Sequence, residues 1–232
     1  MIFEQLFDQK SSTYTYIIAS GEGREALIID PVIEHSDEYS TILKNLDLKL
    51  VKVIDTHIHA DHISALNELN KRTNCIRVMG EKSKSEVIDL RIKDGEKINV
   101  EEVELQAIYT PGHTDCSYSF LMNDRVFTGD TLLINGSGRT DFQNGNAYDA
   151  YDSIFNKLLK LPEKTLVFPA HDYNGKKFST IENEKNNNPR LQVSSKEEYA
   201  DIMNNLNLAN PKMMDVAAVS YTHLTLPTIL PV

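Results

Sequence analysis

The stretch DTHIHADH, residues 55–62, places three histidines and two aspartates between an apolar run and a helix-like pattern. His57 and His59 are two positions apart, and a chain that leaves a strand in extended form points alternate side chains the same way. Both imidazoles can therefore face one point. Asp61 can either join them as a ligand or cap the helix that follows. Imidazole with carboxylate suits hydrolytic zinc or non-haem iron, so the pattern predicts a metal site without naming the metal.

Three further runs with the composition of strands each end in a possible metal ligand. VELQAIYTPG is followed by His113, RVFTG is followed by Asp130, and TLVFPA is followed by His171. Packing alone seldom places so many histidines and acids at strand ends, and the combination favours a metal centre built from several segments. His35, in a polar turn, and His223, near the C-terminus, are interpreted as solvated side chains.

Strands and helices alternate around these residues. Residues 13–20, 25–31 and 49–55 are rich in β-branched, aromatic and apolar side chains and predict strands. Residues 36–48 favour an amphipathic helix capped by Ser36, and residues 147–161 favour a helix that stops before Pro162. This order predicts a layered α/β domain in which helices cover a sheet core.

Composition and charge narrow the class of protein. The chain has 232 residues, 41% of them hydrophobic, and no apolar run approaches the roughly 18 residues that would span a bilayer. We expect a protein that interacts with no membrane, and the N-terminus lacks the pattern of a targeting peptide, which favours the cytoplasm. The net charge of -10 argues against nucleic-acid binding. Cys75 and Cys116 are far apart and predict no disulfide framework.

The motifs THIHADH, TPGHTD, FTGD and PAHD resemble the metal-binding motifs of the metallo-β-lactamase superfamily. The resemblance runs from about residue 12 to about residue 218 and implies an αββα sandwich with the site at the open edge of two sheets. It also implies up to two metals and, by default, a two-zinc hydrolase. The implied ligands on one side are His57, His59 and His113, those on the other are Asp61, His62 and His171, and Asp130 lies between them.

Two other stretches sharpen the choice of branch. GSGRTDFQNG, residues 136–145, and PAHDYNGKKFSTIENEKNNNPRL, residues 169–191, resemble persulfide dioxygenases of the ETHE-like branch, which oxidise glutathione persulfide with O2 to sulfite and glutathione. That resemblance implies one Fe(II) held by His57, His113 and Asp130, and a possible homodimer. His59, Asp61, His62 and His171 would then orient ligands or hydrogen-bond iron-bound species.

Two alternatives remain at this point. A glyoxalase II-like hydrolase would cleave glutathione thioesters with two zinc ions, but its glutathione pocket depends on a helical C-terminal domain that this chain is too short to hold. A binding or regulatory module would be expected to have lost ligands, and this chain keeps the full set.

Glutathione carries two carboxylates, so its site should contain basic or hydroxyl donors. The candidates are Arg139, Arg190 and Tyr173. Arg139 could equally form a structural ion pair with Asp141. Asp172 is expected to anchor its loop through hydrogen bonds, and no catalytic role is expected for Cys116.

The C-terminal segment departs from the family pattern. From about residue 219 the chain reads VSYTHLTLPTILPV, an abrupt change that suggests a frame change, read-through or assembly artefact. We therefore expect a single domain over residues 1–218 and exclude residues 219–232 from functional reasoning.

Overall fold

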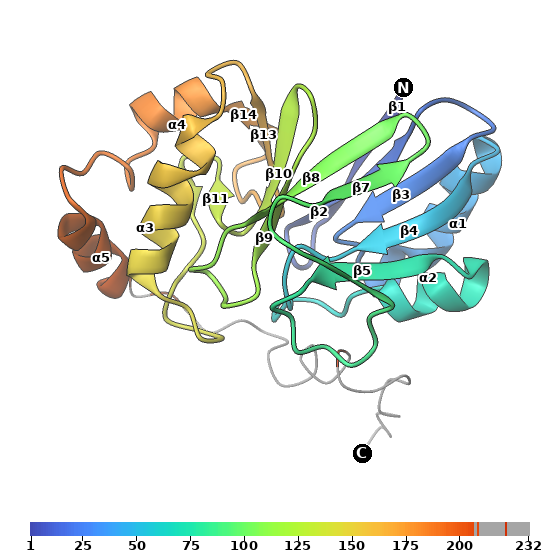
Figure 1. Ribbon diagram of the computed structural model, residues 1–232, viewed down its shortest axis with the longest axis horizontal. Helices are drawn as coiled ribbons and strands as arrows, with labels where there is room; N and C mark the ends of the chain where they lie inside the picture. The colour runs from blue at the N-terminus through green and yellow to red at the C-terminus, as the bar shows by residue number, and fades with distance from the viewer. Residues whose placement is uncertain (207, 209–220, 222–232) are drawn as a thin grey trace.

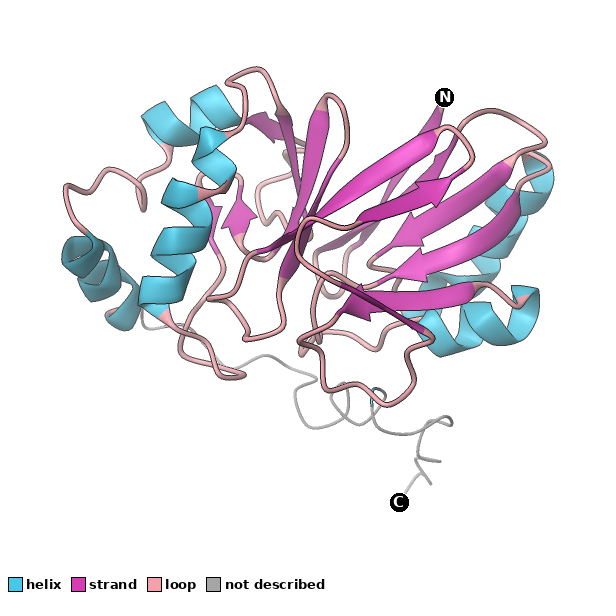
Figure 2. Ribbon diagram, in the orientation of Figure 1, coloured by secondary structure: helices cyan, strands magenta, loops and turns pink. Residues whose placement is uncertain are grey.

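The computed structural model describes residues 1–206, Leu208 and Tyr221. Two six-stranded sheets face each other, with α1 and α2 outside the first sheet and α3, α4 and α5 outside the second (Figure 1, Figure 2). The αββα sandwich expected from the sequence is therefore confirmed. None of the helices among the described residues is long and apolar enough to cross a membrane.

The first sheet has the strand order β1-β2-β3-β4-β5-β6. β1, β2 and β3 pair antiparallel, and β3, β4, β5 and β6 pair parallel. The bounds are β1 Ile2–Asp8, β2 Thr13–Ala19, β3 Glu25–Ile29, β4 Lys49–Ile54, β5 Ile76–Gly80 and β6 Leu90–Ile92, with a 3-10 turn at Ile33–His35, α1 at Ser36–Asn45 and α2 at Leu66–Thr73.

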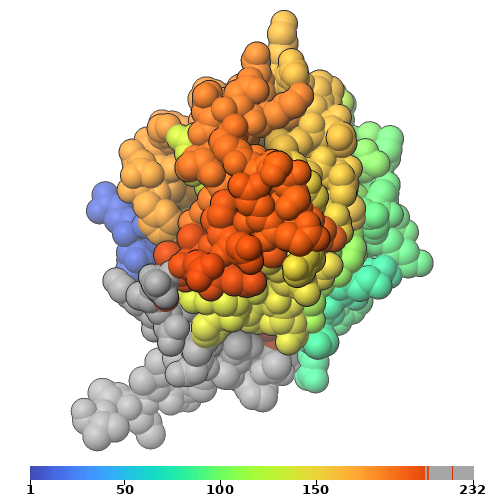
Figure 3. All heavy atoms as spheres, turned by 90° about the vertical axis from the view of Figure 1, so that its left-hand side faces the viewer, coloured from blue at the N-terminus to red at the C-terminus, as the bar shows by residue number. Residues whose placement is uncertain are grey.

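The second sheet has the order β14-β13-β10-β9-β8-β7. Its strands are β7 Lys97–Val100, β8 Val103–Tyr109, β9 Tyr118–Leu121, β10 Arg125–Gly129, β13 Leu166–Pro169 and β14 Ser179–Thr180. A separate two-stranded ribbon comprises β11 Leu132–Leu133 and β12 Gly136–Ser137. The outer face of the second sheet is covered by the helices α3 Ala147–Asn156, α4 Ile181–Asn187 and α5 Lys196–Asn204. Figure 3 shows these helices in yellow to red.

Side-chain alternation explains the three layers of core. In β2, Tyr14, Tyr16 and Ile18 point into the cluster between the two sheets, while Ile17 and Ala19 point into the cluster under α1 and α2. Successive strand side chains face opposite sides, so one strand with both faces covered contributes to two cores. A third cluster lies between the second sheet and α3 to α5, and includes Ile154 and Leu158.

The predicted strands and helices are confirmed, with shifted ends. The first predicted helix ends at Asn45, and Ser36 is its first residue; the Ser36 hydroxyl donates to the carbonyl of Ile33 and does not cap the helix. The helix predicted to extend to residue 161 ends at Asn156 and is followed by a 3-10 turn at Leu158–Lys160. Helix ends depend on local capping, which periodicity alone does not fix.

The segment from residue 219 to 232 lies outside the described residues except for Tyr221. Tyr221 is buried, and its hydroxyl donates a hydrogen bond to Asp55 at 2.8 Å. His223 also lies outside the described residues, so its interpretation as a solvated side chain stays a prediction.

Candidate metal centre

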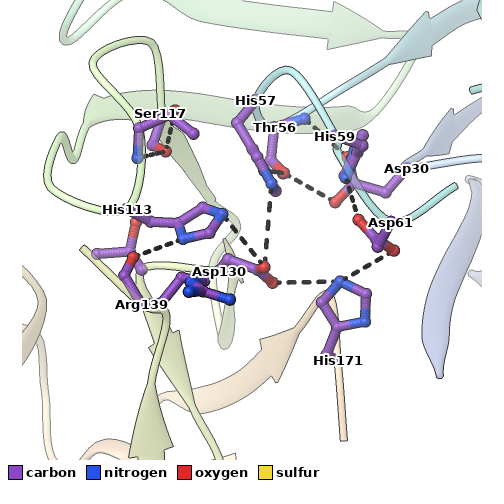
Figure 4. Close-up of polar contacts among 12 residues, drawn as sticks. Asp30, Thr56, His57, His59, Asp61, His113, Ser117, Asp130, Arg139 and His171 are labelled. Carbon is purple, nitrogen blue, oxygen red and sulfur yellow. Dashed lines mark hydrogen bonds and ion pairs between the residues drawn. The ribbon is translucent and has the colours of Figure 1, made fainter. Parts of the chain in front are cut away.

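The four ligand-bearing segments meet at one edge of the sandwich. His57, His113 and Asp130 each offer one ligand atom, and these atoms lie within 4.8 Å of one another. The Nε2 atom of His113 is 3.4 Å from Asp130 Oδ2, and that of His57 is 4.0 Å from the same oxygen. His171 approaches the other carboxylate oxygen of Asp130, with Nε2 at 3.6 Å (Figure 4). These segments follow β4, β8, β10 and β13, as the sequence predicted.

A protein oxygen holds the outward-facing nitrogen of each of the three rings that approach Asp130. The Nδ1 atom of His57 is 2.9 Å from the Thr56 hydroxyl, that of His113 is 2.8 Å from the Arg139 carbonyl, and that of His171 is 3.0 Å from the Ser12 carbonyl. Partners of this kind fix the tautomer and turn the other nitrogen toward a metal. The two carbonyls are backbone groups, so residue type could not have identified them.

Asp30 is a buried residue of the site that sequence reasoning missed. One of its carboxylate oxygens accepts from the backbone N–H of Thr56 at 2.7 Å and lies 3.1 Å from His59 Nε2; the other accepts from the Thr56 hydroxyl at 2.9 Å. Asp30 thereby fixes the His59 ring directly and the His57 ring through Thr56 (Figure 4). Its position near the end of the strand predicted over residues 25–31, directly after β3 in the structure, is the signal that could have found it.

Gly129 is required where β10 turns toward Asp130. Its φ is +52°, and a Cβ atom built there would lie 2.6 Å from the Thr56 hydroxyl oxygen. A side chain at this position would therefore clash with the residue that holds His57. The glycine lets the strand that carries Asp130 approach the strand that carries the histidines.

His59, Asp61 and His62 form a second group beside the first, and His171 approaches Asp61. Asp61 Oδ2 is 2.9 Å from His62 Nδ1 and 3.5 Å from His171 Nε2, and Asp61 Oδ1 is 4.0 Å from His59 Nδ1. Thr13, on β2, donates to Asp61 at 3.1 Å. Asp61 does not cap α2. The N-cap residue of this helix is Ala65, and no side chain forms a capping hydrogen bond there.

Burial and charge favour the protonation states that metal binding needs. Burial lowers the pKa of His57 and of His59 well below the usual value, and the neighbouring histidines add to this effect. Burial opposes ionisation of Asp130, but His171, His113 and His57 together lower its pKa. A metal requires neutral imidazoles and ionised carboxylates, and these residues are held in those states.

Several buried polar atoms of the cluster also fit a metal. Among the described residues, Asp130 Oδ1, His59 Nδ1 and His62 Nε2 are buried side-chain atoms without a hydrogen-bond partner. A buried polar atom that lacks a partner costs free energy, and coordination of a cation would remove that cost. Two of these atoms, His59 Nδ1 and His62 Nε2, belong to the second group. The donor set can therefore hold one ion at His57, His113 and Asp130, and it can also hold a second ion beside the first.

A cavity of about 380 Å³ opens beside the cluster. His113, Asp130, Asp61 and His171 line one part of it, and the three candidate substrate-binding residues Arg139, Tyr173 and Arg190 also line it. This volume is in the range of small-molecule sites. The Tyr173 ring lies parallel to that of His171, with centroids 6.1 Å apart, and the side chain is 72% exposed.

Arg139 forms the structural ion pair that the sequence left as an alternative. Its guanidinium donates to both carboxylate oxygens of Asp141 at 2.7 Å, while its carbonyl orients His113. The Arg190 guanidinium donates to the carbonyl of Ser137.

Asp172 is a loop anchor, as expected, because one of its carboxylate oxygens accepts from the N–H groups of Asn174 and Lys176 at 2.8 and 2.7 Å. Cys116 is buried, and this burial raises the pKa of its thiol, which disfavours a reactive thiolate. His35, interpreted as a solvated side chain, is 29% exposed, and its two ring nitrogens also pair with acids, at 3.0 Å from Asp8 and 2.8 Å from Glu38.

Comparison with known proteins agrees with this architecture. Residues 9–89 and 80–171 match the metallo-beta-lactamase superfamily. The chain is 42% identical over 220 residues to the mouse (Mus musculus) mitochondrial persulfide dioxygenase ETHE1, covering 94% of this chain and 86% of the relative. The crystal structure of ETHE1 from Myxococcus xanthus superposes with a TM-score of 0.92 at 48% identity, covering 95% of this chain and 97% of that one. A hydroxyacylglutathione hydrolase from Dictyostelium discoideum is 29% identical over 185 residues, 75% of this chain and 68% of its own length.

Proposed function

Since the chain belongs to the metallo-beta-lactamase superfamily and, within it, to the family of ETHE1 persulfide dioxygenases, we propose that it oxidises glutathione persulfide with O2 to sulfite and glutathione. The observation that carries the proposal is the group His57, His113 and Asp130 at the wall of a cavity sized for a small molecule. The similarity to persulfide dioxygenases, which is greater than that to the hydrolase, selects the reaction.

We assign one Fe(II) per chain to the two imidazoles of His57 and His113 and the carboxylate of Asp130. Two histidines and a carboxylate leave several coordination positions open, which suits iron enzymes that bind both O2 and a substrate. Bound iron would supply electron-transfer chemistry toward O2, which zinc lacks.

The remaining polar residues of the cluster orient the site. His59, held by Asp30, keeps the chain between His57 and Asp61 in place. Asp61 contacts both His62 and His171. These three side chains can exchange hydrogen bonds and protons with reacting species. Burial lowers the pKa of His171, but Asp130 and Asp61 outweigh this effect and raise it to about 9, so His171 can donate a proton at neutral pH.

Glutathione persulfide would enter the cavity with its sulfur toward Asp130. Arg190 and Tyr173 line the same cavity and offer donors for the carboxylates of glutathione. Arg139 contributes to the same wall, with its guanidinium already paired to Asp141. A cytoplasmic location and a homodimer stay predictions; the mouse relative is named as mitochondrial.

The test is O2 uptake by anaerobically purified, iron-loaded protein after addition of glutathione persulfide, with sulfite measured as product. We expect O2 consumption that stops when iron is removed. Iron-loaded protein that takes up no O2 would overturn the proposal.

A two-zinc thioesterase is the second candidate, and the second group of ligands favours it, because His59, Asp61 and His62 also offer atoms within 4.8 Å of one another. It predicts hydrolysis of S-lactoylglutathione without O2. Comparing the two assays on the same preparation, iron-loaded and zinc-loaded, separates oxidation from hydrolysis.

A further inference from the structure

Gln143 lines the cavity and is attached to the segment that carries the first metal ligands. Its side-chain nitrogen Nε2 donates to the carbonyl of Ile58 at 3.0 Å, across 85 positions of the chain. Ile58 lies between His57 and His59. Gln143 belongs to neither group of metal ligands, yet it lines the cavity beside them. It therefore contacts the ligand segment and borders the space that a substrate would occupy.

The backbone holds Gln143 in a conformation that few residues adopt. The φ angle is +45° at Gln143 and +58° at Asn144, in the left-handed region. Such conformations cost free energy and persist where surrounding contacts impose them, often at binding sites. Here the Asn144 side chain donates to Asp115 at 3.0 Å, and a Cβ atom at Gly145 would lie 2.8 Å from the His113 carbonyl oxygen. The loop is thus packed closely against the segment that carries His113, and this packing holds Gln143 in place.

The contact with Ile58 fixes the orientation of the Gln143 amide. A carbonyl oxygen can only accept a hydrogen bond, so it must contact the NH2 end of the amide. The amide oxygen, Oε1, lies at the other end of the group and has no hydrogen-bond partner among the described residues. Because Gln143 lines the cavity, this oxygen is available to accept a hydrogen bond from a ligand.

We propose that Gln143 is a specificity-determining residue whose Oε1 accepts a hydrogen bond from the peptide N–H of the substrate's cysteinyl residue. The inference rests on the proposed function and adds that the site favours persulfides carried by a peptide. A persulfide whose sulfur reaches the proposed iron ligands brings its β-carbon and peptide nitrogen close to the ligand segment, to which Gln143 is attached. Arg190 and Tyr173, which come from other segments of the cavity wall, are left for the terminal carboxylates.

The chemistry of the acceptor selects this donor among the groups of glutathione. Oε1 can only accept, so it cannot pair with a carboxylate or a carbonyl of the substrate. The ammonium group of glutathione is a cation, and a carboxylate pairs with it more strongly than a neutral amide does. Of the peptide N–H groups, the cysteinyl one is nearer to the sulfur. A simple persulfide without this N–H would leave Oε1 unpaired, which is the kind of mismatch that produces specificity.

The test is a binding cycle in iron-loaded protein kept without O2, measured by isothermal titration calorimetry. S-Methylglutathione keeps the peptide N–H groups and has no terminal sulfur to oxidise, and its analogue methylated at the cysteinyl nitrogen lacks the proposed donor. We expect the wild type to bind S-methylglutathione about fivefold more tightly than the analogue, as one hydrogen bond would provide. Gln143→Met keeps the length of the side chain without its oxygen, and should bind the two ligands with nearly equal affinity.

Gln106→Met is the matched control, because Gln106 lies on the exposed face of β8 and does not line the cavity. This variant should keep the preference of the wild type. If Gln143→Met only loosened the loop, it would weaken both ligands by the same factor and keep the preference. That result would overturn the role given to Gln143, as would a wild type that shows no preference or does not bind S-methylglutathione.

The proposed reaction is tested separately by O2 uptake. A wild type that shows the binding preference but takes up no O2 with glutathione persulfide would overturn the reaction and leave the role of Gln143 in binding intact. In an active protein, Gln143→Met should raise KM for glutathione persulfide about fivefold with little change in kcat, because the hydrogen bond is made equally in the bound substrate and in the transition state. A loss confined to kcat would contradict a role in substrate selection.

Discussion

At the scale of single residues, the site depends on which group each polar atom contacts. His57, His113 and Asp130 face one another, while His59 is held from behind by the buried carboxylate of Asp30. Direct ligands and orienting residues should therefore respond differently to truncation, although the same motif supplies both.

Asp130→Ala removes the only carboxylate of the proposed iron site, and we expect it to abolish iron retention. His59→Ala should leave iron bound and lower kcat about 10- to 100-fold, as is usual for residues that orient ligands. Metal analysis of both purified variants beside the wild type checks this. Equal metal loss in the two variants would favour a two-metal site.

The pair Asp8–His35 predicts a pH dependence of stability. Although burial opposes ionisation of Asp8, hydrogen bonds from Ser11 and His35 lower its pKa from 3.8 to about 2. This stabilisation is present above pH 3.8 and is lost as the pH falls toward 2. Burial lowers the pKa of His35, but Asp8 and Glu38 raise it above 6.5 overall, so its contribution is present below pH 6.5 and is lost as the pH rises through the folded-state value.

His35→Gln should therefore lower the free energy of unfolding most between about pH 4 and 6.5, by about 1 kcal/mol. The two proteins should converge at higher pH. Urea unfolding of wild type and variant at pH 3, 5 and 9 measures the difference; a constant difference across this range would contradict the ion-pair account.

At the scale of elements, α4 holds the wall of the cavity through Glu184. This carboxylate is fully buried and accepts from the N–H of Asn135 and from the side chain of Asn188, each at 2.8 Å. Asn188 also donates to the Gly136 carbonyl at 2.9 Å, so the helix fixes the β11–β12 ribbon. That ribbon leads directly to Arg139, whose carbonyl orients His113.

Glu184→Ala should destabilise the protein by about 3 kcal/mol, because it leaves several buried donors without an acceptor. Iron should also be bound less tightly, since the orientation of His113 depends on the ribbon. Glu182→Ala, on the exposed side of the same helix, is the matched control and should change neither property appreciably. Denaturant unfolding and metal titration measure the two properties. Equal stability and equal iron affinity of the two variants would contradict the role given to Glu184.

At the scale of the whole molecule, the residues predicted a layered α/β domain with a metal centre built from several strand ends, because the type and spacing of these residues are local. The αββα sandwich itself was implied by the resemblance of the motifs to the metallo-β-lactamase superfamily. Long-range and backbone partners were not predictable: Asp30 and His59 are 29 positions apart, and the carbonyls of Ser12 and Arg139 have no signature in residue type. The pairing of His35 with Asp8 was missed for the same reason.

The central claim is a single iron at His57, His113 and Asp130. Its most direct test is the identity and number of metal ions per chain in protein purified without O2 and without added metal, measured by elemental mass spectrometry against protein concentration. We expect one iron per chain. Two zinc ions per chain would contradict the assignment of iron and would favour the hydrolase.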